Sequence, residues 1–204
     1  MSTVSTTSSE INQEQEEGAR ADMYGLLATL YFNAPSAELL QAIAQAQPQG
    51  DSLLGQAWTE LSEACRNMEE AQIQEEYHQL FIGVSKPEIM LYGSYYLSGF
   101  LMEKPLAELR TDLEKLGLSR PDNVNETEDH VASLFEVMRI LILSAEPGEA
   151  GLTAQKHFYS VHIRSWIELL CDALENHPQA MFYKRLSNLT RKFVEIENQA
   201  FEMG

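Results

Sequence analysis

The residues best suited to acid–base or metal chemistry lie between Glu126 and His130. These two are four positions apart, which would place them on one face of a helix, and Asp129 is adjacent to the imidazole. One carboxylate and one imidazole do not complete a closed metal site. Acids in a first helical turn also cap the backbone and offset the helix dipole. The residue types alone favour this structural role.

Other signatures of catalysis are missing from the sequence. It contains no phosphate-binding glycine loop, no dinucleotide fingerprint, no zinc-protease helix and no serine nucleophile elbow. His157 and His162 stand among aromatic residues, where a histidine more often belongs to the core or its rim. Cys65 and Cys171 are far apart and indicate neither a disulfide framework nor a zinc cluster. We therefore expect a protein that is not an enzyme, with no catalytic residue, no metal and no bound cofactor.

The charge of the chain limits its partners. Lys and Arg number 14 and Asp and Glu number 31 among 204 residues, giving a formal net charge of −17. A general nucleic-acid binder needs the opposite sign, and anionic lipid headgroups would repel such a surface. A short basic peptide would be attracted, although solubility alone explains the charge equally well. With no secretory signal and no apolar stretch that spans a bilayer, we expect no stable membrane insertion and a cytoplasmic location.

The hydrophobic pattern is helical along most of the chain. Apolar residues recur at three- and four-residue steps, and no convincing alternating strand appears. The sequence therefore predicts an all-α fold, a compact bundle of about nine or ten helices in two lobes joined by a hinge. We expect a disordered tail over residues 1–9, an N-terminal helical lobe over 10–117, a hinge connector over 118–126 and a C-terminal helical lobe over 127–204.

Several helix ends are marked by their residue types. Ser36 and Asp51 are expected N-caps, and Asn125 with Glu128 has the spacing of a capping box that would open the helix after the connector. Pro105 suits the first turn of another helix, whose end Gly117 marks.

The segment from Gly83 to Gly99 breaks the helical pattern. Proline, glycine and serine are interleaved there with apolar and aromatic residues, among them three tyrosines. A loop with so many rings is either folded back onto the core or presents an apolar face to a partner.

Two motifs carry a resemblance to a known family. The run EEYHQLFIG over residues 75–83, followed by Pro87 and by YGSYY over residues 92–96, resembles the signature of the TorD/DmsD/NarJ redox-enzyme maturation chaperones. NETEDH over residues 125–130 is similar to the E-P-x-D-H hinge motif of that family, with Thr127 in place of the usual proline. The two motifs stand in the family's order, and within the family they most resemble the TorD branch. The threonine restores a backbone N–H and frees φ, so the connector can be softer here.

The resemblance implies a cytoplasmic chaperone for a molybdoenzyme. Such a protein binds the precursor of a molybdenum-containing terminal reductase, through its twin-arginine signal peptide and its apo-form. It thereby favours insertion of the molybdenum cofactor before export. For the TorD branch the client is trimethylamine N-oxide reductase. Weak binding of guanine nucleotide is a further implication, although the sequence has no phosphate-cradling loop.

A twin-arginine signal joins a cationic segment to an apolar stretch, so its receptor needs an apolar groove rimmed by acids. Glu76, Glu126, Glu128 and Asp129 are the candidates for pairing with guanidinium groups. Periodicity alone favours a core position for the first aromatic residues of the motif. The predicted signal-peptide site comprises Tyr77, Leu80, Phe81, Tyr92, Ser94, Tyr96, Glu126, Asp129 and His130.

Two other functions remain open from the sequence. A nucleotide- or metal-dependent enzyme would use Asp129 and His130 as an acid–base pair. A general helix-binding adaptor would use the same groove for a different amphipathic helix, and composition does not separate it from the chaperone.

The connector also bears on assembly. If residues 118–126 straighten, the C-terminal lobe can dock onto the N-terminal lobe of a second chain through contacts that already exist. We therefore expect that a domain-swapped homodimer is accessible.

Overall fold

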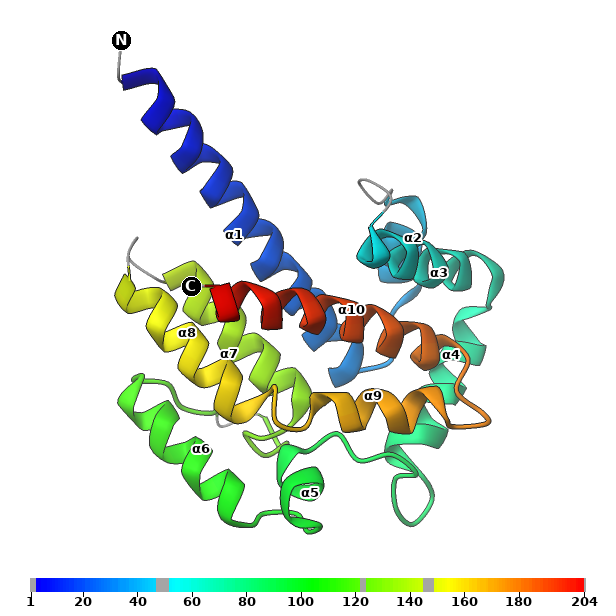
Figure 1. The fold of residues 1–204 in the computed structure, drawn as a ribbon. Coiled ribbons are helices and arrows are strands. Elements are labelled where there is room, and N and C mark those ends of the chain that lie inside the picture. Colours follow the sequence, from blue (N-terminus) through cyan, green and yellow to red (C-terminus); the bar gives the residue numbers. More distant parts are fainter. Residues whose placement is uncertain (1–2, 47–51, 122–123, 145–148, 204) are drawn as a thin grey trace.

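The computed structural model describes residues 3–46, 52–121, 124–144 and 149–203. Across these residues the chain forms α-helices and one π-helical turn, and no strand, which confirms the predicted all-α class (Figure 1). The π-helical turn covers His78–Ile82. The helices are α1 (Thr3–Phe32), α2 (Ala37–Gln45), α3 (Leu53–Asn67), α4 (Glu70–Tyr77), α5 (Gly93–Ser98), α6 (Lys104–Lys115), α7 (Val131–Ser144), α8 (Glu149–His162), α9 (Ile167–Glu175) and α10 (Phe182–Met203).

The core is shared by both predicted lobes. Helix α1 packs along α7, and α10 packs against both α3 and α9. The apolar stripes of these helices meet in one continuous core, in which Trp166, Tyr24, Tyr31 and Tyr159 are among the largest fully buried side chains. An exchange of residues 127–204 between two chains would have to rebuild the α1–α7 and α3–α10 interfaces. The lobe boundaries and the swapped dimer stay predictions.

The first helix begins earlier than the sequence predicts. Residues 3–9 were expected in a disordered tail, and they instead continue α1, while residues 1–2 lie outside the described residues. Serine and threonine cost only a few tenths of a kcal/mol each in a helix, and a nucleated helix adds further turns readily. Figure 1 shows this N-terminal part of α1 projecting away from the other helices.

The helix caps were predicted with mixed success. Ser36 caps α2, with its Oγ accepting from the Leu39 N–H, and Gly117 follows α6 at a positive φ of 70°. Ser52 caps α3 through the Gly55 N–H, whereas the predicted cap, Asp51, lies outside the described residues. The predicted capping box of Asn125 and Glu128 is wrong, because α7 begins only at Val131.

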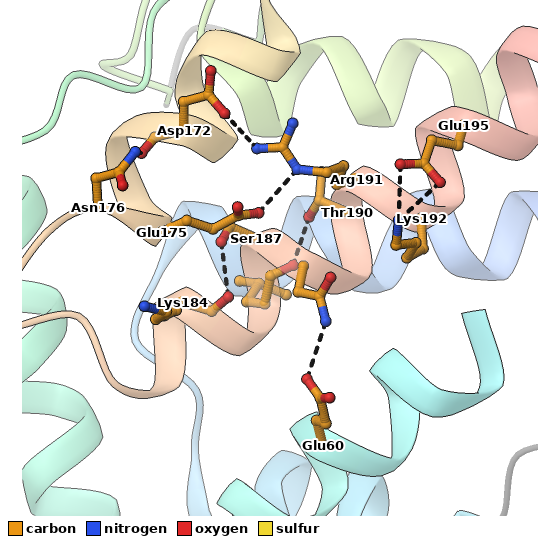
Figure 2. A network of polar contacts seen from close by, with 12 residues as sticks. Glu60, Asp172, Glu175, Asn176, Lys184, Ser187, Thr190, Arg191, Lys192 and Glu195 are labelled. Carbon is orange, nitrogen blue, oxygen red and sulfur yellow. Dashed lines mark hydrogen bonds and ion pairs between the residues drawn. The ribbon is translucent and has the colours of Figure 1, made fainter. Parts of the chain in front are cut away.

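Ion pairs fix α10 on its neighbours. Figure 2 shows Arg191 of α10 between Asp172 and Glu175 of α9, with nitrogen to oxygen distances of 2.7 and 3.0 Å. Toward α3, the side-chain amide of Asn188 in α10 donates to the Glu60 carboxylate at 3.0 Å. These contacts are partly exposed, so each adds little stability and mainly sets the orientation of α10.

A buried carboxylate of the first motif holds the start of α10. Both oxygens of Glu76 accept backbone N–H groups at the N-terminus of this helix, those of Met181, Phe182 and Tyr183, at 2.8 to 3.0 Å. These donors have no partner within the helix, and the negative charge also complements the helix dipole. Glu76 therefore ties α4 to a helix that begins more than 100 residues later, and it is not available to a guanidinium.

We predict that Glu76→Ala lowers the free energy of unfolding by about 2–4 kcal/mol, since it leaves three backbone donors without an acceptor. Urea denaturation followed by circular dichroism measures the change. Glu75→Ala is the matched control, because the neighbouring Glu75 is exposed. Equal stability of the two variants would contradict the role of Glu76.

Candidate functional site

The first motif forms a turn that returns the chain to the core. After the π-helical turn, the Gly83 N–H donates to the His78 carbonyl at 2.8 Å, and Glu88 and Ile89 both donate to the Leu80 carbonyl. Gly83 has a φ of 63°, and a Cβ there would lie 2.0 Å from the Lys86 carbonyl oxygen. Only glycine fits this position, which explains the last residue of the motif.

Three residues predicted to line an open groove are instead in the core. Tyr77, Leu80 and Phe81 are all buried, and the rings of Tyr77 and Phe81 pack against Tyr183 of α10. The Tyr77 hydroxyl donates to the carbonyl of Phe32, at the end of α1, at 2.6 Å. The groove prediction is therefore wrong for these side chains, because helical periodicity places them on the buried face.

The two motifs bind each other across 35 residues. The Tyr92 hydroxyl donates to the Glu126 carboxylate. The Gly93 N–H donates to the Asp129 carbonyl, and the Ser94 N–H donates to the Asp129 carboxylate, both at 2.9 Å. The Val131 N–H donates to the Leu91 carbonyl at 2.8 Å. We call these two segments, residues 91–94 and 126–131, the motif junction.

The junction places α5 directly on the core. A Cβ on Gly93 would lie 2.9 Å from Nε1 of Trp166, so a larger residue would push α5 away. The ring of Tyr96 stacks on Trp166 with centroids 5.3 Å apart, and its hydroxyl donates to the Met90 carbonyl. Tyr96, half-buried, thus helps to seat α5. Ser94 is fully buried, and its Oγ accepts from the Met102 N–H at 3.3 Å.

Asp129 and His130 point to different partners. Besides Ser94, the Asp129 carboxylate accepts from the Thr127 hydroxyl at 2.6 Å, so the residue that departs from the family's proline supports this acid. His130 Nδ1 accepts from the Ala132 N–H, and its ring packs edge-on against Tyr92 and Phe32. Burial lowers the pKa of His130 from 6.5 to about 4, so its imidazole is neutral at physiological pH. Both side chains are buried and position the junction.

The acidic candidates differ in what already binds them. Glu76 and Asp129 accept backbone N–H groups, and Glu128 pairs with Arg110 at 2.9 Å and lies 3.9 Å from Arg120. Glu126 is half-buried, and among the described residues its carboxylate bonds to the Tyr92 hydroxyl and has no ion pair. Of the four, Glu126 alone is, among the described residues, neither paired with a cation nor bonded through its carboxylate to a backbone N–H.

An exposed apolar surface lies next to the junction, and sequence reasoning missed most of it. We call it the α5 surface; Phe100 and Met102, at 69% and 71% exposure, are its most open side chains. Met102 has a φ of 60°, a conformation that costs a non-glycine residue energy and that the Ser94 bond maintains. In the sequence, the apolar run around Gly99, with its little polar content, was the feature that could have indicated this surface. The surface comprises Tyr95, Leu97, Phe100, Leu101 and Met102.

A cavity of about 480 Å³ lies beside the junction, whose residue Glu128 is part of its wall. We call it the α1–α7 cavity, since these helices form its main walls, and residues 118–121, Val124 and Leu113 of α6 line the rest. Glu128 is the single predicted guanidinium partner that lines it, and none of the predicted groove residues does. Sequence reasoning missed the cavity because it depends on how α1 packs against α7. Its lining residues are Ala28, Thr29, Phe32, Leu113, Leu118, Ser119, Arg120, Pro121, Val124, Glu128, Ala132, Ser133, Glu136, Val137 and Ile140.

Comparison with known proteins now places the chain in a family. Residues 47–172, more than half of the chain, match the family model of the nitrate reductase delta subunit. The chain belongs to this family. The match spans both motifs and the junction between them, and it confirms the family that the motifs indicated.

Curated relatives extend the match beyond this segment. Chaperone protein TorD of Vibrio cholerae (strain El Tor Inaba N16961) is 24% identical, over 90% of this chain and 92% of the relative. The TorD chaperone of Aliivibrio fischeri is 26% identical, over 87% and 92%, and that of Photobacterium profundum is 28% identical, over 68% of each chain. The chain is therefore similar to TorD chaperones over most of its length.

Two features are absent from the described residues. Within residues 3–46, 52–121, 124–144 and 149–203, no group of three or more His, Cys, Asp or Glu side chains is arranged to hold a metal ion. None of the helices in this part of the chain combines the length and the apolar character needed to cross a membrane.

The buried imidazole predicts a pH dependence of stability. Because the folded-state pKa of His130 is about 4 and the unfolded value is 6.5, only the unfolded chain takes up this proton between these values. Stability is therefore fully present above pH 6.5 and falls as the pH drops toward 4, by up to about 3 kcal/mol from this group. In His130→Gln, urea denaturation from pH 7 to pH 4.5 should show a flatter dependence than in the wild type. The exposed-site control His78→Gln should keep the wild-type slope, and an unchanged slope in His130→Gln would contradict this account.

Proposed function

We propose that this protein is a cytoplasmic maturation chaperone for a molybdoenzyme. It binds the twin-arginine signal peptide and the apo-form of the precursor, and it favours insertion of the molybdenum cofactor before export. The similarity to TorD chaperones supports this role and supports a trimethylamine N-oxide reductase as the client. The order of the two motifs and their mutual contacts are consistent with the same assignment.

The α5 surface is the observation that carries the proposal. Five large apolar side chains within eight residues are exposed, although most side chains of this size in the protein are buried. Soluble monomers rarely leave large apolar patches exposed without a binding role, so five exposed apolar side chains this close in the chain are a candidate binding surface. The apolar, helix-forming stretch of a signal peptide is a partner whose burial there removes apolar area from water.

Buried motif residues hold the α5 surface in place through hydrogen bonds. Asp129 caps α5 at Ser94, and Ser94 in turn holds the backbone of Met102. Asp129 and Ser94, which are buried, thus act by fixing the position of the exposed α5 surface, most of which follows the motif in the chain. In this proposal Tyr92 and Tyr96 lie at the border of the bound peptide, and Leu80 and Phe81 act through packing.

The proposal predicts that Phe100→Ser combined with Met102→Ser weakens binding of a synthetic twin-arginine signal peptide by about tenfold or more, because two apolar contacts are lost. Isothermal titration calorimetry measures the affinity. Leu169→Ser combined with Met181→Ser, which removes two exposed apolar side chains from the region of α9 and α10, is the matched control and should bind normally. Equal affinities in all three proteins would rule out the α5 surface.

A second prediction concerns salt. The net charge of −17 should accelerate the approach of an arginine-bearing peptide, and salt screens this attraction. Raising NaCl from about 50 mM to about 500 mM, where the Debye length falls several-fold, should lower the association rate in stopped-flow fluorescence much more than it raises the dissociation rate. A rate that does not depend on salt would mean that the charge serves solubility alone.

A further inference from the structure

Several polar groups gather at the C-terminal end of α1. The last turn of α1 carries no basic residue, and its carbonyl groups form the negative end of the helix dipole. The Tyr77 hydroxyl donates to the Phe32 carbonyl, and the Phe32 ring lies 6.2 Å from that of His130. The negative charge of Glu126 helps to raise the pKa of Tyr77 to about 12, after the larger effect of burial. The Tyr92 hydroxyl binds Glu126, and the Tyr92 ring contacts His130, which in turn contacts Phe32, so these contacts link Glu126 to this helix end.

The neighbouring charged side chains are already engaged. His130 is neutral at physiological pH, and Arg120 donates to the backbone carbonyls of Val124, Asn125 and Glu126 at 3.0 to 3.3 Å. Glu128, at the cavity wall, is paired with Arg110. An incoming cation would have to displace Arg110 to reach Glu128, whereas it meets only a hydroxyl at Glu126.

The α1–α7 cavity begins at the same helix end. Phe32 belongs to both places, since its side chain lines the cavity and its ring contacts His130. Ala28, Ala132, Val137 and other apolar residues make up most of the remaining wall. A volume of about 480 Å³ is within the range of pockets that bury a ligand or several side chains.

We propose that Glu126 receives the guanidinium group of an arginine and that the α1–α7 cavity takes apolar side chains that follow this arginine in the same peptide. This inference rests on the proposed function and specifies its arginine subsite. The carboxylate keeps one oxygen on the Tyr92 hydroxyl and offers its remaining lone pairs to the N–H groups of the guanidinium. A planar guanidinium makes two such bonds and a lysine ammonium makes a single point contact, so the site prefers arginine.

The proposal separates the acidic candidates by experiment. The probes are two synthetic peptides, one with two consecutive arginines before an apolar helix-forming stretch and one with lysines in their place. Wild type should bind the arginine peptide about tenfold more tightly than the lysine peptide. In Glu126→Gln, which keeps the shape and the Tyr92 contact, this ratio should fall to about two or less. In the control Glu75→Gln, whose carboxylate is exposed and lies outside the junction and the cavity lining, the ratio should stay near the wild-type value.

A separate substitution tests the role of the cavity. Ser133→Phe introduces a ring into the α1–α7 cavity and should weaken both peptides equally, by about tenfold, with the arginine preference retained. Leu169→Phe, on the distant α9, is the matched control and should leave both affinities unchanged. Thermal unfolding confirms that each variant is folded. If Glu126→Gln does not fold, Glu126→Asp replaces it as the test. Its carboxylate is shorter by one methylene, so it should also lower the ratio of arginine-peptide affinity to lysine-peptide affinity.

The outcomes distinguish this inference from the proposed function. Wild type that binds both peptides equally, or Glu126→Gln with an unchanged ratio, overturns the arginine subsite and leaves the chaperone role standing. Ser133→Phe with wild-type affinities overturns the role of the cavity. Wild type that binds neither peptide overturns the proposed function and this inference with it.

Discussion

The contact between Asp129 and the start of α5 is the constraint on which the functional region depends. One buried residue accepts the Gly93 N–H through its carbonyl and the Ser94 N–H through its carboxylate. An unpaired carboxylate or backbone donor in this dry setting would cost several kcal/mol, so the two segments stay together. The position of α5 against Trp166 and the loop at Met102 both follow from this contact.

The junction also explains why residues that resemble a binding motif are mostly hidden. Glu76 and Asp129 each satisfy backbone groups of a segment far away in the sequence, and Ser94 binds the backbone of Met102, eight residues further on. Such bonds are specific in direction, and they fix where exposed side chains stand. The contact surface itself then needs only apolar character, which many residue combinations provide. A motif of this kind marks the scaffold of a site more than its surface.

The sequence alone predicted the parts of the fold that depend on local pattern. The apolar stripes predicted the helices, and Ser36 and Gly117 marked helix ends as local chemistry requires. The capping box at Asn125 failed because Glu126 and Asp129 bind Tyr92 and Ser94 in preference to their own helix. The α5 surface and the α1–α7 cavity were missed, since exposure of Phe100 and the gap beside Phe32 arise only from packing between distant helices.

Net charge and local charge have different roles in this protein. The excess of acids acts at long range on any cation, and salt weakens it. Specific recognition needs a carboxylate that is held in place, partly desolvated and not yet paired, because only such a group gains a new ion pair without breaking an old one. Glu128 is held but paired with Arg110, and Asp129 is buried beneath α5. Glu126, held by Tyr92 beside the end of α1, meets all three conditions.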